Sequence, residues 1–436
     1  MDSARGLSIA IWLLLALTIS ISGRVQVDEK KAANETLFEQ GQFAAAETAS
    51  RATLAREPDN FTAALLLSRI ALLSNRLDEA EKWLTAATKL RPENKAAIGF
   101  LAEVFYRRDQ FDRAAPLLRA QGKDAMARQL ESFKGMVPYE VAGSAKAARV
   151  KFINIDPLPL VAVSINHGEE VNFLIDTGGS EVIVDSDFAE KAGIARFGED
   201  MRTFGGGNRA AIAFGHVASL ALGGVEVKNV PVHLLSTQRF SAATRGKPVS
   251  GVIGTVFLYH FLPILDYTGG QLVLEPRTRG SLTELERRAQ LEKQVVIPFW
   301  MAGDHFMVSW GRVSKSGPVL LFVDTGLAGG AYTGPRSVLD EAGIKLIEEK
   351  VGEGIGGAGP MKIVPFEIDE LALGGAKERG LSGVFGPFPA SLEYGQGFRI
   401  GGIISHQFFR HYAVTFDFTG MRFFLKREPE GGHGSD

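Results

Sequence analysis

The tripeptide Asp-Thr-Gly occurs twice in this sequence, and its two acids are the strongest candidates for chemistry. Each copy follows a short apolar run typical of a buried strand, Val171–Ile175 before Asp176 and Val319–Val323 before Asp324. A glycine turn follows, so each carboxylate is expected where a buried strand breaks into a loop. If the fold brings them together, two carboxylates can serve as general acid and general base. A lone copy would indicate no more than a β-turn.

The sequence around the two copies is also repeated. Together with the tripeptides, the matching blocks are displaced by 148 to 151 residues, and they are Phe188–Ile194 with Val338–Ile344, Leu220–Gly224 with Leu371–Gly375, and Gly251–Gly269 with Gly402–Gly420. A near-constant displacement over four blocks indicates an internal duplication.

Composition excludes several kinds of site. The 436 residues suffice for two or three domains, and 45% hydrophobic with 22% charged residues is typical of a globular protein. The formal charge of −2 gives no basic excess for nucleic acid. The absence of cysteine excludes disulfides, a cysteine nucleophile and cysteine-ligated metals, and the eight histidines show no His-Glu-x-x-His spacing. We therefore expect no metal and no cofactor.

Residues 1–23 differ from the rest of the chain. Arg5 precedes an apolar run over residues 7–21, and small residues follow at Ser22 and Gly23. The run is short for a spanning helix, which needs ~20 apolar residues. This favours a secretory signal peptide. The alternative is an uncleaved N-terminal anchor that tethers the chain to the inner membrane. Both interpretations predict export to the periplasm or another extracytoplasmic space.

Residues 28–135 have helical periodicity and a second kind of repeat. Phe43, Leu77 and Phe111 are spaced 34 residues apart, as are three alanines, Ala46, Ala80 and Ala114. This pattern resembles three tetratricopeptide repeats, which imply helix pairs stacked in an α-solenoid. Such an array would bind a protein partner or substrate, or it would be a spacer or folding support.

From residue 150 the pattern changes to short β-type runs broken by Gly and Asn. The duplication divides this part into one lobe over residues 150–276, a linker over 277–294 and a second lobe over 295–427. The linker is charged and free of proline. We expect it to be helical from Ser281, with Ser281 as N-cap and Glu284 completing a capping box.

The motif set resembles that of retropepsin-like and pepsin-like aspartic proteases. A β-run ending in Asp-Thr-Gly, a Gly-rich segment and a hydrophobic-hydrophobic-Gly segment occur in this order twice over about residues 150–427. The resemblance implies two β-lobes that meet about a pseudo-two-fold axis. The expected fold class is therefore multidomain, an N-terminal α-solenoid followed by an all-β bilobed protease. Because one chain carries both halves, the site would form within one chain rather than in a homodimer.

The same resemblance assigns Asp176 and Asp324 as the catalytic pair. Two carboxylates held close together share one proton, so one activates a water and the other hydrogen-bonds the scissile carbonyl. The supporting residues would be Thr177, Gly178, Thr325 and Gly326. The second copy departs from the pattern, because Ser405 stands where the first has Gly254, and Leu327 cannot hydrogen-bond to the pair.

Two Gly-rich stretches lie where the family has flaps that close over substrate. The flap and substrate-binding candidates are Gly205, Gly206, Gly207, Gly354, Gly356 and Gly357. The second stretch also fits G-x-G-x-x-G, but the residues after it resemble a strand rather than a helix, which argues against dinucleotide binding. Glu181, Asp185 and Arg336 lie near the motifs without any pattern that singles them out.

The sequence thus predicts an exported aspartic endopeptidase whose helical repeats dock a protein substrate or partner. Its ligand would be a protein or peptide, with no nucleic acid involved. The alternative is a catalytically inactive, protease-like scaffold that binds peptides, a reading supported by Leu327 and Ser405. Both intact Asp-Thr-Gly copies favour the enzyme.

Overall fold

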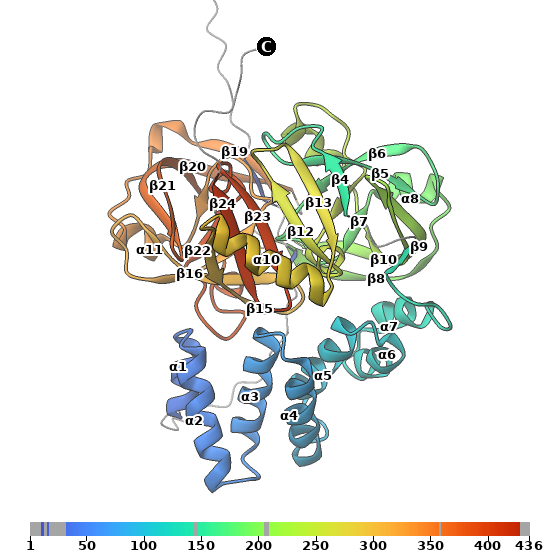
Figure 1. Cartoon of the computed structure of the whole chain (residues 1–436), viewed down its shortest axis with the longest axis vertical. Helices are drawn as coiled ribbons and strands as arrows, with labels where there is room; N and C mark the ends of the chain where they lie inside the picture. Colours follow the sequence, from blue (N-terminus) through green and yellow to red (C-terminus); the bar gives the residue numbers. More distant parts are fainter. Residues whose placement is uncertain are drawn as a thin grey trace, which may run out of the picture.

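A computed structural model describes residues 10–12, 15–16, 32–142, 147–204, 209–356 and 359–427. Two β-lobes lie side by side and a helical array packs along one side of both (Figure 1). The first lobe is drawn in green and the second in orange, with a shared sheet between them in yellow and red. The predicted fold class, a helical-repeat region followed by a β-rich protease-like part, is confirmed.

The array consists of antiparallel helices joined by short turns. They are α1 (Ala33–Glu39), α2 (Phe43–Arg56), α3 (Phe61–Leu73), α4 (Leu77–Leu90), α5 (Lys95–Arg107), α6 (Phe111–Ala120) and α7 (Asp124–Glu131). The residues spaced by 34, Phe43, Leu77 and Phe111, each begin the second helix of a pair. The three periodic alanines are fully buried where helices cross. Their small side chains let neighbouring helices approach closely, which explains the period.

Two asparagines start the helices that open the second and third pairs. The side chains of Asn60 and Asn94 accept the backbone N–H groups of Ala63 and Ala97. This satisfies donors that the first turn of a helix otherwise leaves unpaired.

The first lobe is built on one twisted sheet of order β2-β8-β9-β5-β6-β11-β7-β10-β3. Its strands are β2 (Leu15–Ala16), β3 (Glu140–Ala142), β5 (Leu160–Ile165), β6 (Glu170–Ile175), β7 (Val182–Val184), β8 (Arg196–Phe204), β9 (Arg209–Leu222), β10 (Val225–Leu234) and β11 (Gly251–Ile253), with helices α8 (Ser186–Lys191) and α9 (Thr255–Tyr259). A 3₁₀ helix covers Gln238–Thr244.

The second lobe repeats this order, as the duplication predicts. Its strands are β1 (Ala10–Trp12), β15 (Trp300–Ala302), β16 (Phe306–Val313), β17 (Val319–Asp324), β18 (Tyr332–Thr333), β19 (Gly352–Gly356), β20 (Gly359–Leu373), β21 (Ala376–Phe385) and β22 (Gly402–Ser405), with helices α11 (Arg336–Glu341) and α12 (Ala390–Glu393) and a 3₁₀ helix at Glu348–Lys350. The sheet order is β1-β19-β20-β16-β17-β22-β18, with β15 on β16 and β21 on β20.

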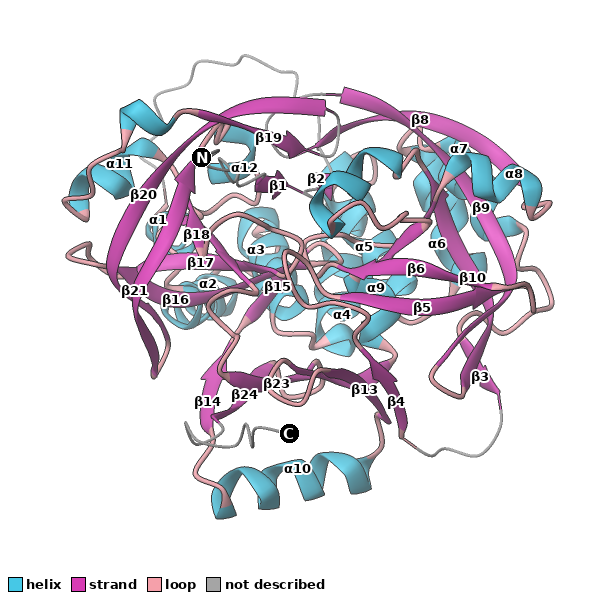
Figure 2. Ribbon diagram, turned by 90° about the horizontal axis from the view of Figure 1, so that it is seen from above, coloured by secondary structure: helices cyan, strands magenta, loops and turns pink. Residues whose placement is uncertain are grey.

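A third sheet joins the lobes, and we call it the interlobe sheet. Its order is β14-β24-β23-β12-β13-β4, from β4 (Ala148–Lys151), β12 (Phe261–Asp266), β13 (Gln271–Pro276), β14 (Val295–Pro298), β23 (Tyr412–Asp417) and β24 (Arg422–Arg427). Strand β12 of the first repeat pairs antiparallel with β23 of the second. Figure 2 shows this sheet at one edge of the molecule, with the linker helix α10 (Arg279–Leu291) across it and strands β8, β19 and β20 at the opposite edge.

The predicted start of the linker helix was wrong. The N-cap is Thr278, whose side chain accepts the N–H of Ser281 while the Ser281 hydroxyl accepts the N–H of Thr278. Glu284 lies inside the helix and pairs with Arg287 instead. Two hydroxyl residues three apart offered two possible capping positions, and the earlier one caps the helix.

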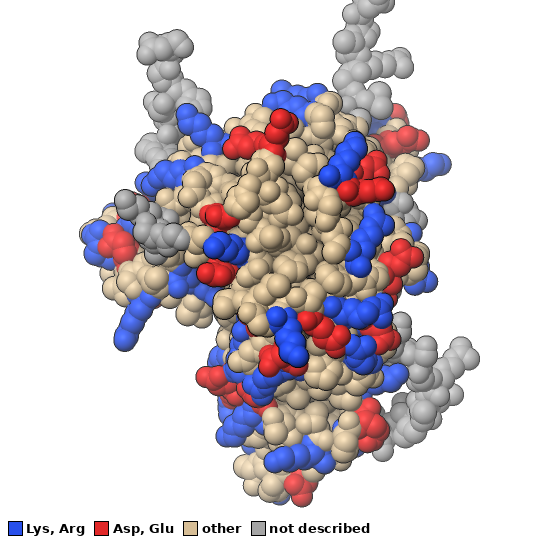
Figure 3. Space-filling model, turned by 90° about the vertical axis from the view of Figure 1, so that its right-hand side faces the viewer, with Lys and Arg blue, Asp and Glu red and all other residues tan. Residues whose placement is uncertain are grey.

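The surface shows mixed charge on the face drawn in Figure 3, where Lys and Arg alternate with Asp and Glu over both the lobe and the array. No continuous basic field covers that face. Among the described residues, no helix is both long and apolar enough to cross a bilayer. The predicted signal peptide or anchor lies mostly outside the described residues, which include only β1 and β2 of it.

Candidate active site

The two candidate acids occupy equivalent places at the ends of central strands. Asp176 directly follows β6, and Asp324 ends β17. Each strand pairs in parallel with a short hydrophobic strand, β6 with β11 and β17 with β22. These flanking strands are the hydrophobic segments of the duplicated motif, and they bury both acids completely. The strand-to-loop position predicted for each carboxylate is where the structure places it.

Each carboxyl lies against the loop of the other lobe. A methyl group added at Gly178 would come within 2.3 Å of the carboxyl carbon of Asp324, and one added at Gly326 would come within 2.4 Å of that of Asp176. The same glycines donate their N–H groups to Asp176 Oδ1 and Asp324 Oδ1, each at 2.8 Å. Glycine is therefore required at both positions because no side chain fits between loop and acid.

Thr177 and Thr325 hydrogen-bond the loop of Asp176 to the loop of Asp324. The backbone N–H of Thr177 donates to Thr325 Oγ1 at 2.9 Å, and that of Thr325 donates to Thr177 Oγ1 at 3.1 Å. The Thr177 hydroxyl donates to the carbonyl of Val323, and the Thr325 hydroxyl donates to that of Ile175. All these groups are buried, so the network fixes the relative position of the two lobes at the acids.

The electrostatics of the pair favour a shared proton. Burial raises the pKa of Asp176 to about 6. Burial also raises the pKa of Asp324 well above its usual range, and the adjacent charge of Asp176 adds to that rise. The outer oxygens, Asp176 Oδ2 and Asp324 Oδ2, have no donor among the described residues. The two acids therefore titrate as a pair that keeps one proton well above the ordinary range of a carboxyl.

The second lobe differs from the first at Ser405, which stands where the first lobe has Gly254, and at Leu327. A methyl group at Gly254 would lie 2.3 Å from the carbonyl oxygen of Ser180, so this position tolerates only glycine. In the second lobe the Ser405 hydroxyl donates to the carbonyl of Gly330 at 2.8 Å and thereby holds the loop that follows Asp324. Leu327 is fully buried and belongs to an apolar cluster shared by the second lobe and helices α1, α2 and α3.

The strands beside the two predicted flap stretches form antiparallel pairs, β8 with β9 and β19 with β20. Gly354 and Gly356 lie in β19, whereas Gly205, Gly206, Gly207 and Gly357 lie outside the described residues. The N-terminal strands lie on the flap edges: β1 pairs in parallel with β19, and β2 pairs antiparallel with β8. Figure 2 shows both short strands between the flaps. The edges of both flaps can thus accept an added strand.

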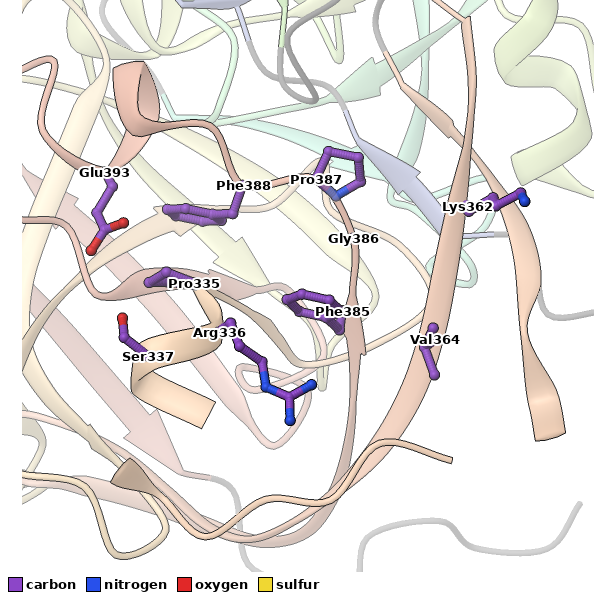
Figure 4. Close-up of a pocket in the computed structure, with 10 residues that line it drawn as sticks. All are labelled: Pro335, Arg336, Ser337, Lys362, Val364, Phe385, Gly386, Pro387, Phe388 and Glu393. Carbon is purple, nitrogen blue, oxygen red and sulfur yellow. The ribbon is translucent and has the colours of Figure 1, made fainter. Parts of the chain in front are cut away.

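A separate hollow of about 560 Å³ lies on the second lobe. It is bordered by the flap strand β20 at Lys362 and Val364 and by the chain from Phe385 to Phe388 (Figure 4). Arg336, which the sequence left without a role, also lines it and pairs with Asp340 on its own helix. Neither acid of the pair lines this hollow.

Two further residues without a sequence signal have defined contacts. Asp185 caps α8 by accepting the N–H groups of Asp187 and Phe188, and it also accepts the N–H of Thr237. Glu181 is buried, and its carboxyl accepts hydrogen bonds from the hydroxyls of Tyr106 in the array and of Tyr139 just before β3. Because both tyrosines are distant from Glu181 in sequence, local spacing could not reveal these two contacts.

Two stretches of the chain match models of known protein families. Residues 161–257, which include Asp176 and Gly254, match the family model of aspartyl proteases. Residues 35–95 match the model of the tetratricopeptide repeat. A search of curated proteins found no relative. The chain thus combines tetratricopeptide repeats, which imply protein interaction, with an aspartyl protease domain, which supports a peptidase and implies a peptide substrate.

Proposed function

We propose that this protein is an exported, retropepsin-like aspartic endopeptidase in which Asp176 and Asp324 activate water to hydrolyse peptide bonds. The observation that carries the proposal is the pair itself. Two fully buried carboxyls from equivalent loops each contact the other lobe, and each leaves one oxygen without a donor among the described residues. A folded protein rarely buries two interacting acids unless the shared proton has a use.

The chemistry follows from the shared proton. The ionised carboxylate takes a proton from a water held between the acids, and the water oxygen attacks the carbonyl carbon of the peptide bond. The protonated acid donates to the carbonyl oxygen, so a neutral tetrahedral intermediate forms. The acid that took the proton from water then donates it to the amide nitrogen, while the other carboxylate takes the proton of one hydroxyl of the intermediate. The carbon–nitrogen bond breaks, a carboxylic acid and an amine leave, and the pair again holds one proton. Each acid serves once as donor and once as acceptor.

The substrate would bind as an extended strand. In support, the flap edges at β19 and β8 already pair with the short strands β1 and β2. Main-chain hydrogen bonds of this kind favour peptides over folded domains and depend little on side-chain identity. We therefore assign unfolded or extended protein segments as the substrate class.

Export and partner docking remain parts of this proposal. The apolar run at residues 7–21 supports secretion or a tether at the inner membrane. The tetratricopeptide match supports docking of a protein on the array, which would raise the effective concentration of a substrate near the acids. Cell fractionation of the full chain tests the first, and cleavage of an array-bound protein against that of short peptides tests the second.

The alternative function is a peptide-binding scaffold without activity. Leu327 supplies no polar group to the pair, which favours this alternative. Against it, both acids of the pair are present, and a scaffold would need neither of them for catalysis.

One experiment separates the two functions. A mixed peptide library is incubated with residues 24–436 of the wild type, Asp176→Asn and Asp324→Asn from acidic to neutral pH, and products are identified by mass spectrometry. Cleavage by the wild type alone supports the enzyme. Peptide binding by all three folded proteins without cleavage by any supports the scaffold.

A further inference from the structure

Two consecutive residues of the repeat array contact both protease lobes. The Tyr106 hydroxyl, near the end of α5, donates to the carboxyl of Glu181 in the first lobe. The guanidinium of Arg107, the last residue of α5, donates to the carbonyls of Met301, at 3.0 Å, and Gly303 in the second. Figures 1 and 2 both place α5 at the junction of the lobes. One helix end therefore spans the junction.

Glu181 belongs to the loop that carries Asp176. It lies five residues after that acid, and its carboxyl also accepts the Tyr139 hydroxyl at 2.9 Å. Only 2% of Glu181 is exposed, so its hydrogen bonds compete with no solvent. Burial raises the pKa of Glu181 well above its usual range, which favours a neutral carboxyl at this place.

The array also contacts α9, whose first residues hydrogen-bond to the same loop. The N–H groups of Thr255 and Val256 donate to the carbonyls of Gly179 and Ser180, each at 2.9 Å. At the far end of α9, the Tyr259 hydroxyl donates to Asn75 Oδ1 at 3.0 Å.

His260, the residue that follows α9, also contacts a polar residue of the array. His260 Nε2 lies 3.1 Å from the carboxylate of Asp109, and the His260 ring stacks on Tyr139. Asn75 and Asp109 both belong to turns of the array. One polar contact thus connects the array directly to the loop of Asp176, and two more reach it through α9.

On the second lobe, Arg107 holds the turn between β15 and β16. Its side chain is 3% exposed, and it also donates to Glu103 and to the carbonyl of Leu72 within the array. The turn continues into His305, a buried residue that pairs with Asp304 and packs against Phe306 of β16. Strand β16 pairs with β17, the strand that ends at Asp324.

We propose that Tyr106 and Arg107 are positioning residues, and that the repeat array acts as a clamp that adds to the threonine network in holding the two acids in place. Tyr106 acts through Glu181 on the first loop, and Arg107 acts through the β15–β16 turn on the second lobe. Because they are neighbours on one helix, their relative position is fixed by the helix backbone. A mere spacer would not need buried hydrogen bonds to both lobes. This inference rests on the proposed protease function.

The test measures kcat and KM of the full chain on a short peptide found in the library digestion. Tyr106→Phe removes one hydroxyl and keeps the ring in place. We expect kcat to fall about tenfold with KM within about twofold of the wild type, because small displacements of reacting groups cost rate rather than binding. Glu181→Ala should show the same loss, and Glu181→Gln, which matches the neutral carboxyl in shape, should recover most of kcat. Arg107→Met is a second variant that probes the other lobe.

The matched control is Leu84→Ala in α4, a buried residue of the array on a helix that packs between α3 and α5. It should lower the melting temperature without changing kcat below that temperature. If Tyr106→Phe and Glu181→Ala behave like Leu84→Ala, with lower stability and wild-type kcat, the array only stabilises the fold and the clamp is wrong. A wild type that cleaves no peptide contradicts the protease function, and with it the clamp. An active wild type with unaffected variants contradicts the clamp alone.

Discussion

Thr177 and Thr325 exchange hydrogen bonds reciprocally across the junction of the lobes. Each hydroxyl accepts the backbone N–H of the other threonine and donates to a strand carbonyl of the opposite lobe. The two loops therefore form one unit, and neither acid can move far without breaking a buried hydrogen bond.

Replacing either threonine with valine should destabilise the protein by about 1–3 kcal/mol, because a buried N–H of the other lobe loses its acceptor. Thr177→Ser and Thr325→Ser keep the hydroxyl, so these variants should lose much less stability. The free energy of unfolding in urea measures the effect. Because the residues share one network, the double valine variant should lose less than the sum of the single losses. Valine variants as stable as the serine variants would contradict the role of the hydroxyls.

Alanine at Gly178 or Gly326 should reduce kcat on the order of 10²-fold, because the added methyl group would lie within 2.4 Å of the opposing carboxyl carbon and displace it. Peptide hydrolysis by the purified variants measures this. Gly317→Ala is the matched control, since the space beside Gly317 is open. Equal activity of all three alanine variants would show that the loops tolerate a side chain beside the acids.

The activity should depend on pH in the near-neutral range. Catalysis requires one proton on the pair, and burial raises the pKa of Asp176 to about 6. Below that value the pair gains a second proton and loses its base, so kcat/KM should rise with pH through about 6 and fall only where Asp324 ionises. The measurement uses a peptide without titratable side chains from pH 4 to 9. An optimum below pH 5 would contradict the raised pKa values.

Asp176→Asn should abolish turnover and change how stability depends on pH. The pKa of Asp176 lies above its ordinary value of 3.8 in the folded state, so the folded protein binds more protons than the unfolded chain. The contribution of Asp176 to the free energy of unfolding is fully present below pH 3.8 and is lost as pH rises through about 6. The asparagine variant should lose less stability over this interval than the wild type. Urea unfolding at several pH values measures this difference. If the free energies of unfolding of the two proteins change in parallel with pH, Asp176 does not have a raised pKa.

Residues 1–23 should inhibit the enzyme while they are attached. Strands β1 and β2 pair with the flap edges on which we expect the substrate to bind. A chain that starts at residue 1 should therefore show a higher KM on short peptides than one that starts at residue 24, with a similar kcat at saturation. Steady-state kinetics on both forms, in detergent if needed, tests this. Identical KM values would mean that the N-terminal strands do not compete with substrate.

Much of the architecture could be predicted because it depends on local patterns. The period of 34 marks helix starts at Phe43, Leu77 and Phe111, and the duplicated blocks predict two equivalent lobes. Asp176 and Asp324 stand out because a buried strand that ends in an acid and a glycine is uncommon by chance, and more so when it occurs twice. The cap of α10 was misplaced by three residues because Thr278 and Ser281 have similar capping chemistry.

The contacts between array and lobes could not be predicted. Tyr106 and Glu181 are 75 residues apart, and a tyrosine in a helix is ordinarily part of an apolar face. Arg107 ends its helix like many surface arginines, yet its side chain is buried against carbonyls of the second lobe. Such pairs depend on how separate units dock, and a single sequence holds no periodic signal for docking.

The interlobe sheet has a consequence for symmetry. Since β12 and β23 hydrogen-bond within one chain, the two halves meet without an encounter between molecules, and dilution should not inactivate the enzyme. One chain also lets the halves differ. The residue five positions after Asp176 is Glu181, whereas the residue five positions after Asp324 is Gly329. A homodimer would display the glutamate twice and recruit two competing arrays. Because only the first half carries the glutamate, the molecule has one binding position for one array.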